Sequence, residues 1–231
     1  MPRLIDLSQE IAHRAPVLPL FPPVQVFPFI THEDHTGDTD AETVSPLVNT
    51  LILSDHCSTH VDAFSHFSRE RRADSIDTMP LELFYTEAIC LDLSHKPPKS
   101  LITVEDVEKA LVKDDLEVAQ GDTVLIHTGH HERTFGTPAF YTDWAGIVAD
   151  VVPLFAKRGA VAFGVESFGP GIFGISNDDV HRLCGELDIT HYENLVNLDK
   201  LVGKGRFRFI AFPLKIRGGS GSPVRAVAVL E

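Results

Sequence analysis

The sequence contains only three cysteines, which limits the kinds of protein it can be. Cys57, Cys90 and Cys184 are odd in number and widely separated. A disulfide framework is therefore not expected, and the composition fits a reducing compartment.

Long apolar stretches are also missing. The N-terminal segment MPRLIDLSQEIAHRAP carries charges at Arg3, Asp6, Glu10 and Arg14, so it is typical of neither a secretory signal nor a membrane anchor. No apolar run approaches the ~20 residues that a transmembrane helix requires. The sequence therefore predicts a cytoplasmic protein that does not span or bind a membrane.

Basic residues are too few to predict a nucleic-acid surface. The chain has 20 Lys and Arg against 33 Asp and Glu, which gives a formal net charge of −13 at pH 7. Binding to phosphate backbones or to anionic lipid needs clustered Lys and Arg. We expect neither partner, and we interpret the negative charge as a contribution to solubility.

The patterning that is present predicts one domain over residues 1–231. Hydrophobic residues make up 43% of the chain and charged residues 23%, which is ordinary for a globular protein with a sizeable core. Strand-like runs outnumber helical patterns and the two are mixed in order, which indicates an α/β or α+β domain with a large sheet. The expected strands are 4–7, 24–30, 49–53, 88–93, 123–127, 160–165, 206–216 and 224–230, and the expected helices begin after an N-cap at Thr103, span 144–157, and begin after a capping box at Ser176.

The segment HCSTHVDAFSH concentrates metal-competent side chains at the end of a strand-like run, 48–54. Because every interval between these side chains is even, an extended chain would direct all of them to one side, whereas a helix would separate them. Three imidazoles and one carboxylate on one surface suit zinc or another divalent transition metal. The residues concerned are His56, His60, Asp62 and His66.

Other interpretations of the histidines stay open. Within the motif, the alternative is a set of solvated histidines beside a helix capped by Thr59 or Asp62. The segment 31–44 contains further metal-competent residues, and we interpret it as a solvated loop, with a lid over the site as the alternative. These residues are His32, Asp34, His35 and Asp38. The histidines of HTGHH, 127–131, follow an expected strand and belong to a loop or to a pocket wall.

The motif resembles the HxGTHxDxPxH signature of the cyclase family of metal-dependent hydrolases, the family of bacterial kynurenine formamidase. Several separated matches in the same order are more specific than one short motif, so the chain is identified as a member of this family. The further matches are IDLS at 5–8, LIHTG at 125–129, HYENLVNLDKL at 191–201 and SPVRAVAVL at 222–230.

The resemblance implies two metal positions that share one carboxylate. His56, His60 and Asp62 would hold one ion, and Asp62 would bridge to a second ion completed by His181 and Glu193. The ions would be Zn or Mn, with one or two per subunit.

The remaining residues near these ligands have distinct implied roles. The resemblance makes His66 the proton shuttle rather than a tight ligand. From its own spacing, His181 is more simply interpreted as a surface histidine and Glu193 as a solvated carboxylate. His191 competes with Glu193 as a nearby ligand.

The implied fold is a swivelling β/β/α domain with a β-barrel-like core and flanking helices, and the implied assembly is a homodimer or homotetramer. The implied reaction is hydrolysis of a small amide, in which a metal-bound hydroxide attacks the carbonyl and His66 transfers the proton. The expected substrate is N-formyl-L-kynurenine, which would give L-kynurenine and formate. Ring opening of an isatin-like cyclic amide or of a lactone is the alternative.

Three positions depart from the family pattern without removing a ligand. Ser58 replaces the usual glycine, Phe64 the usual proline, and Glu166 a frequent aspartate. Each could reshape the pocket. Phe64, with Phe168, Phe173 and Trp144, would suit a flat aromatic substrate, although most of the 15 phenylalanines are expected to fill cores.

Two other functions fit the sequence less well than the hydrolase does. A non-catalytic metal-binding module would have no use for His66 as a proton shuttle. Nucleophilic catalysis by Cys57 or Ser58 lacks a general base that is independent of the metal ligands. Cys57 also has the wrong parity to point with the histidines of the motif.

Overall fold

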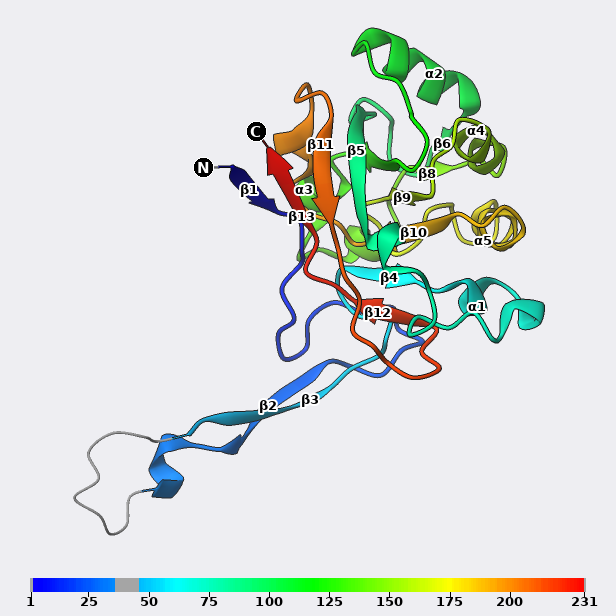
Figure 1. Cartoon of the computed structure of the whole chain (residues 1–231). Helices are drawn as coiled ribbons and strands as arrows, with labels where there is room; N and C mark the ends of the chain where they lie inside the picture. The colour runs from blue at the N-terminus through cyan, green and yellow to red at the C-terminus, as the bar shows by residue number, and fades with distance from the viewer. Residues whose placement is uncertain (1, 36–45, 231) are drawn as a thin grey trace.

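A curled sheet of nine strands forms the centre of the computed structural model, which describes residues 2–35 and 46–230 (Figure 1). The strand order is β1-β13-β11-β5-β7-β9-β10-β4-β12. The bounds are β1 Arg3–Asp6, β4 His60–Asp62, β5 Tyr85–Asp92, β7 Thr123–His127, β9 Ala162–Gly164, β10 Thr190–Glu193, β11 Phe207–Ile210, β12 Gly221–Pro223 and β13 Val227–Leu230.

The middle of the sheet is parallel and both of its sides are antiparallel. Strands β5, β7, β9 and β10 pair in parallel, and helices connect them along the chain. Three of them, α2 Val104–Lys113, α4 Val151–Lys157 and α5 Asn177–Glu186, lie together on one face of the sheet (Figure 1). The remaining α-helices of the described residues are α1 Phe64–Phe67 and α3 His130–Thr134.

Each face of the sheet has its own apolar core, as a curled sheet with helices on one side requires. Between the sheet and helices α2, α4 and α5, the buried residues include Leu111, Phe155 and Val180. The opposite face is filled by a second core that includes Tyr192 and Phe209. The predicted mixed α/β architecture with a barrel-like core and flanking helices is confirmed.

Two small sheets complete the structure. Strands β6 Leu101–Ile102 and β8 Gly146–Ile147 pair in parallel beside α2 and α4. Strands β2 Gln25–Ile30 and β3 Val48–Ile52 pair antiparallel as a hairpin that extends away from the rest of the molecule (Figure 1). We call β2 and β3 the arm.

Two expected elements are shorter than predicted because of proline. The helix predicted for 144–157 begins only at Val151, since Pro153 lacks an N–H and fits a helix only in its first turn. Residues before it form β8 instead. The strand predicted for 206–216 ends at Ile210, and Pro213 makes only an isolated bridge with Val224.

The two predicted helix caps differ in outcome. Thr103 caps α2 as expected, and its Oγ1 accepts from the N–H of Asp106 at 3.2 Å. The capping box predicted at Ser176 is wrong. Its hydroxyl donates to the Ile147 carbonyl at 2.8 Å and accepts from Ile172 N–H, so it joins α5 to β8.

No helix in the described part of the chain is long and apolar enough to cross a membrane.

Candidate metal centre

The histidine motif forms a strand with a bend on each side of it. His60 and Asp62 lie on β4, two residues apart, so they share one face as predicted. His56 precedes the strand, and His66 lies on the short helix α1, four residues after Asp62. The expectation of a fully extended motif is therefore wrong at both ends, although all four side chains still meet.

A backbone turn at Ser58 orients His60. Ser58 has φ 57°, the left-handed region that favours glycine, which is the residue usual at this position in the family. Its hydroxyl donates to the Gln9 carbonyl at 2.8 Å, which helps to hold this conformation. The Ser58 carbonyl accepts from His60 Nδ1 at 2.9 Å. His60 Nε2 therefore carries a lone pair and faces the carboxylates.

A glycine- and serine-rich segment before β12 orients His56. The Ser220 hydroxyl lies 2.9 Å from Asp55 Oδ2 and 2.9 Å from His56 Nε2. Because Asp55 can only accept, we assign the hydroxyl proton to it and let His56 Nε2–H donate to Ser220. The Nδ1 lone pair of His56 then faces Asp62. A Cβ at Gly221 would come within 2.9 Å of the His56 ring, so this position must lack a side chain.

Strand register brings the distant residues to the motif. On β10, which pairs antiparallel with β4, Glu193 lies directly opposite His60. His191, two residues earlier, shares the face of Glu193 and is fully buried. His181 reaches the same point from α5, and its Nδ1 lies 2.8 Å from the Asn177 carbonyl, which again leaves Nε2 with a lone pair.

Together these side chains form what we call the motif cluster. Its members are His56, His60, Asp62, His66, His181, His191 and Glu193. Around Asp62 Oδ1 lie His56 Nδ1 at 2.8 Å and His60 Nε2 at 3.4 Å. Around Asp62 Oδ2 lie His191 Nε2 at 3.2 Å and His181 Nε2 at 3.8 Å.

The donor atoms of the motif cluster fit a divalent cation. His60 Nε2 and Asp62 Oδ1 are buried and make no hydrogen bond with any described residue. Buried polar atoms are normally paired, so such atoms need an explanation, and an ion is one. Zn–N and Zn–O bonds of about 2.0–2.1 Å place tetrahedral ligand atoms about 3.3–3.4 Å apart, close to several spacings observed here.

The charges of the motif cluster favour a cation as well. Burial alone would lower the pKa of His56, but the negative charge of the adjacent Asp62 outweighs burial and raises the pKa to about 9. Burial opposes ionisation of Asp62, yet the neighbouring histidines, His56 foremost, hold its pKa well below the ordinary value. The negative electrostatic potential that favours the protonated form of His56 would also favour a bound metal ion.

His66 is the member of the motif cluster nearest to solvent. Its side chain is 34% exposed, whereas that of Asp62 is 1% exposed. His66 Nε2 lies 3.8 Å from Asp62 Oδ2, and the ring centre is 4.3 Å from that of His56. Burial of the inner edge is the main cause that lowers the pKa of His66, so the ring is neutral near pH 7.

A second group combines histidine with carboxylate, and we call His127, Glu132 and Glu166 the β7–α3 cluster. Glu166 Oε2 accepts from Thr128 N–H and Oγ1, both at 2.6 Å, and from His130 N–H at 3.2 Å. His127 Nδ1 donates to Oε1 at 3.2 Å. Glu166 therefore ties the turn after β7 to β9, which is a structural role.

The remaining candidates from the sequence are not brought to the motif cluster. Cys57 is buried in a small apolar cluster, and burial raises the pKa of its thiol to about 11, so it is not a nucleophile at neutral pH. His32 and Asp34 belong to none of the metal-competent groups among the described residues, and Asp38 lies outside the described residues.

The aromatic residues at the centre differ from those expected. Phe64 packs into the core and against Arg71, while Phe168 and Trp144 belong to a separate aromatic group. The rings that contact the motif cluster are Phe21, stacked on His56 at 6.0 Å, and Phe67 and Phe163, stacked on His191. Only the position of Phe67, one residue after the motif, could have indicated such a contact.

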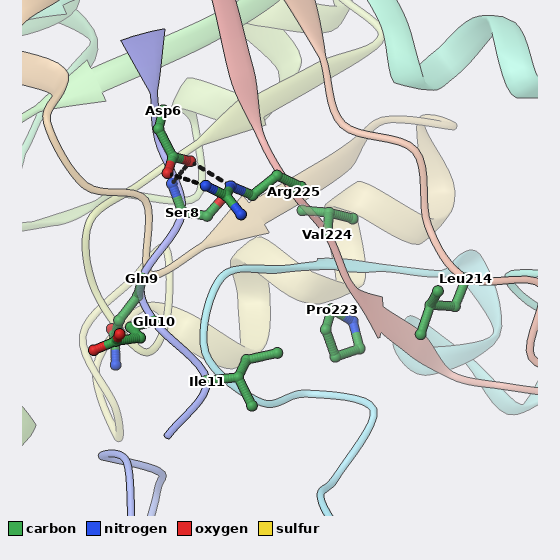
Figure 2. Close-up of a pocket in the computed structure, with 9 residues that line it drawn as sticks. All are labelled: Asp6, Ser8, Gln9, Glu10, Ile11, Leu214, Pro223, Val224 and Arg225. Carbon is green, nitrogen blue, oxygen red and sulfur yellow. Dashed lines mark hydrogen bonds and ion pairs between the residues drawn. The ribbon is translucent and has the colours of Figure 1, made fainter. Parts of the chain in front are cut away.

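A pocket of about 520 Å³ lies elsewhere, where β1 meets the segment after β12 (Figure 2). Its Asp6 and Arg225 pair with each other at 2.7 and 2.9 Å. None of the motif cluster lines this pocket, so we do not place the reaction there. The lining residues are Asp6, Ser8, Gln9, Glu10, Ile11, Leu214, Pro223, Val224 and Arg225.

Comparison with known proteins shows the family and the fold of the chain. A family model described as "Putative cyclase" matches residues 5–171. A kynurenine formamidase of Salinibacter ruber is 28% identical over 230 residues, covering 97% of this chain and 96% of the relative. An isatin hydrolase of Roseibium aggregatum is 27% identical over 197 residues, covering 79% and 74%. The solved structure of isatin hydrolase A from Ralstonia solanacearum superposes with a TM-score of 0.86 at 27% identity, covering 100% of this chain and 92% of that one.

Proposed function

The chain belongs to the cyclase family, and from this membership we propose that it hydrolyses N-formyl-L-kynurenine to L-kynurenine and formate. It is a metal-dependent hydrolase of small amides that acts on C–N bonds other than peptide bonds. The kynurenine formamidase relative, which aligns over nearly the whole of both chains, supports the arylformamidase reaction in particular.

One observation carries the metal-dependent part of this proposal. His56, His60 and His181 each tie one ring nitrogen to a hydroxyl or a backbone carbonyl, and each directs the other nitrogen at a buried carboxylate. Fixing the outer nitrogen in this way is the usual means by which proteins orient metal-binding histidines. Solvated or merely structural histidines have no reason to converge in this manner.

We assign the ligands as follows. His56, His60 and Asp62 would hold one divalent ion, and Asp62, His181 and Glu193 would hold a second, with Zn or Mn as the metal. A divalent cation in such a set supplies Lewis acidity toward water and toward the substrate carbonyl. The protein's share is to hold the two carboxylates and the histidine rings rigidly at the end of the sheet.

His66 is assigned the proton transfers. Its ring is neutral near pH 7 and stands between the buried carboxylate and solvent. It takes a proton from the attacking water as the new C–O bond forms, and it returns a proton to the nitrogen as the C–N bond breaks. The second proton of the water leaves when the acid product ionises, so the products are a carboxylate, an amine and one proton released to solvent, and atoms and charge balance.

A ring-opening activity on isatin-like cyclic amides or lactones is the second candidate. The superposition on isatin hydrolase A over the full length of this chain favours it. Phe21, stacked on His56, gives an aromatic surface beside the centre that suits either substrate.

The proposed function is tested by assaying N-formylkynurenine and isatin side by side. Chelated enzyme should be inactive and should recover with added zinc or manganese, and the variant His60→Ala should stay inactive. Turnover of isatin alone would replace the first substrate by the second. Metal-independent turnover of either substrate would contradict the mechanism.

We also propose that the chain forms a homodimer or homotetramer through the arm. An isolated two-stranded hairpin is marginally stable in water, yet the arm extends from the body (Figure 1). It exposes Phe29 by 70% and Leu51 by 54%. A second copy covering these residues would explain both facts. Sedimentation should show an oligomer that Phe29→Glu dissociates, and a wild-type monomer would refute the assembly.

A further inference from the structure

His191 is the most deeply buried polar member of the motif cluster, and no ligand role is assigned to it above. It is fully buried on β10. Its ring lies between Phe67, at 5.2 Å and 16°, and Phe163, at 5.3 Å and 22°. Two flanking aromatic rings leave the imidazole little freedom to turn, so its nitrogens point in fixed directions.

Those directions bring Nε2 to the second metal position. His191 Nε2 lies 3.2 Å from Asp62 Oδ2 and 3.2 Å from Glu193 Oε1. His181 Nε2 lies 3.8 Å and 4.0 Å from the same two oxygens. The two imidazole nitrogens thus face the same pair of carboxylate oxygens, and all four atoms lie within 4.8 Å of one another.

Resting on the metal centre of the proposed function, we infer that His191 is a fourth protein ligand of the second ion. Two histidines and two carboxylates complete a tetrahedron without water, which is typical of closed metal sites. Position 191 then holds a ligand in addition to Glu193 rather than in competition with it.

This assignment makes the two metal positions unequal. The ion at His56 and His60 lies on the side of His66, whose side chain is 34% exposed, and keeps a coordination position for water or substrate. The ion at His191 is enclosed by protein, because the side chains of its ligands are at most 16% exposed. We therefore expect the enclosed ion to exchange slowly and the other to carry the reaction.

The test is a titration of the chelated full-length chain with Co²⁺, followed by calorimetry and by visible absorption. The wild type should bind two ions. Both His191→Ala and His191→Phe should weaken one of them more than about 100-fold, leave the other unchanged, and reduce the tetrahedral Co²⁺ absorption. His191→Phe keeps the aromatic stack, so it separates loss of a ligand from loss of packing. His127→Ala, from the β7–α3 cluster, is the matched control and should bind both ions normally.

The outcomes separate this inference from the proposed function. Two ions with wild-type affinity and spectrum in both His191 variants would refute the ligand role and leave the hydrolase intact. If the wild type binds only one Co²⁺ ion, and both His191 variants bind it with unchanged affinity, the ligand role is refuted in the same way. A wild-type chain that binds no Co²⁺ would refute both.

Discussion

The motif cluster and the β7–α3 cluster contain the same kinds of residue but differ in how their polar atoms are paired. In the β7–α3 cluster, the buried carboxylate of Glu166 receives four hydrogen bonds from the turn that it holds. In the motif cluster, His60 Nε2 and Asp62 Oδ1 are just as buried and make none with the described residues. A histidine and a carboxylate in contact are therefore weak support for a metal site, whereas buried lone pairs that converge without a partner support the site proposed at the motif cluster.

The largest expected effect is on catalytic activity, when a histidine whose lone pair points into the motif cluster is replaced by alanine. We expect His60→Ala to lower kcat/KM at least about 1000-fold, or about 4 kcal/mol, because the ion that we propose at His56 and His60 would lose a ligand. The matched change His127→Ala should leave kcat/KM of the folded enzyme within a few fold. Comparable losses in the two variants would break the distinction between the clusters.

A second large effect is expected at the edge of the motif cluster. We expect His66→Ala to lower kcat about 100- to 10,000-fold while metal content per chain stays at the wild-type value, since we propose that this residue transfers protons. Elemental analysis of the purified variant checks the metal. Loss of one ion together with activity would make His66 a ligand instead.

The β7–α3 cluster should respond in stability rather than in activity. Glu166→Gln leaves buried donors poorly paired, so we expect the free energy of unfolding to fall by about 3 kcal/mol. Denaturant titration measures this, and metal content should not change. Reduced metal binding with unchanged stability would assign the β7–α3 cluster to function.

The smallest expected effect is a pH dependence of the stabilisation that His127 and Glu166 provide. Burial lowers the pKa of His127, but the hydrogen bond and charge of Glu166 outweigh it and raise the pKa. Burial raises the pKa of Glu166, but His127 and Thr128 outweigh it and lower the pKa. The raised pKa of His127 contributes its full stabilisation when the pH is below the pKa of histidine in the unfolded chain, about 6.5. The lowered pKa of Glu166 contributes its full stabilisation when the pH is above the pKa of glutamate in the unfolded chain, about 4.5. Both contributions are therefore complete between about pH 4.5 and 6.5.

The destabilisation by Glu166→Gln should therefore be greatest near pH 5.5. It should shrink by about 1 kcal/mol at a pH where His127 is neutral, because a hydrogen bond between charged groups becomes one to a neutral donor. Unfolding of both chains at the two pH values gives the difference. An equal or larger destabilisation at high pH would show that His127 is neutral in the pair throughout.

The sequence predicted the part of the motif cluster that local geometry controls. Alternation along an extended chain placed His60 and Asp62 on one face, and that holds on β4. It failed at His66, because the chain turns into α1 directly after the strand. A helix of four residues leaves too little periodicity to be recognised.

The distant half of the motif cluster depends on pairing that periodicity does not contain. Glu193 meets His60 only because β10 and β4 pair in one register. The family resemblance, rather than spacing, selected His181 and Glu193. Ser220 and Gly221, which position His56, gave no chemical signal in the sequence because glycine and serine are ordinary loop residues.

The pairing of β4 with β10 on one side and β12 on the other has a consequence for biosynthesis. The residues that build the centre extend from Asp55 to Gly221, so all of the intervening chain must be synthesised before the centre can assemble. The assembled centre therefore cannot guide the folding of the segments that are synthesised first. A fragment that ends before β10 would carry the motif in full and still lack His191 and Glu193, two of the side chains that we assign to the second ion.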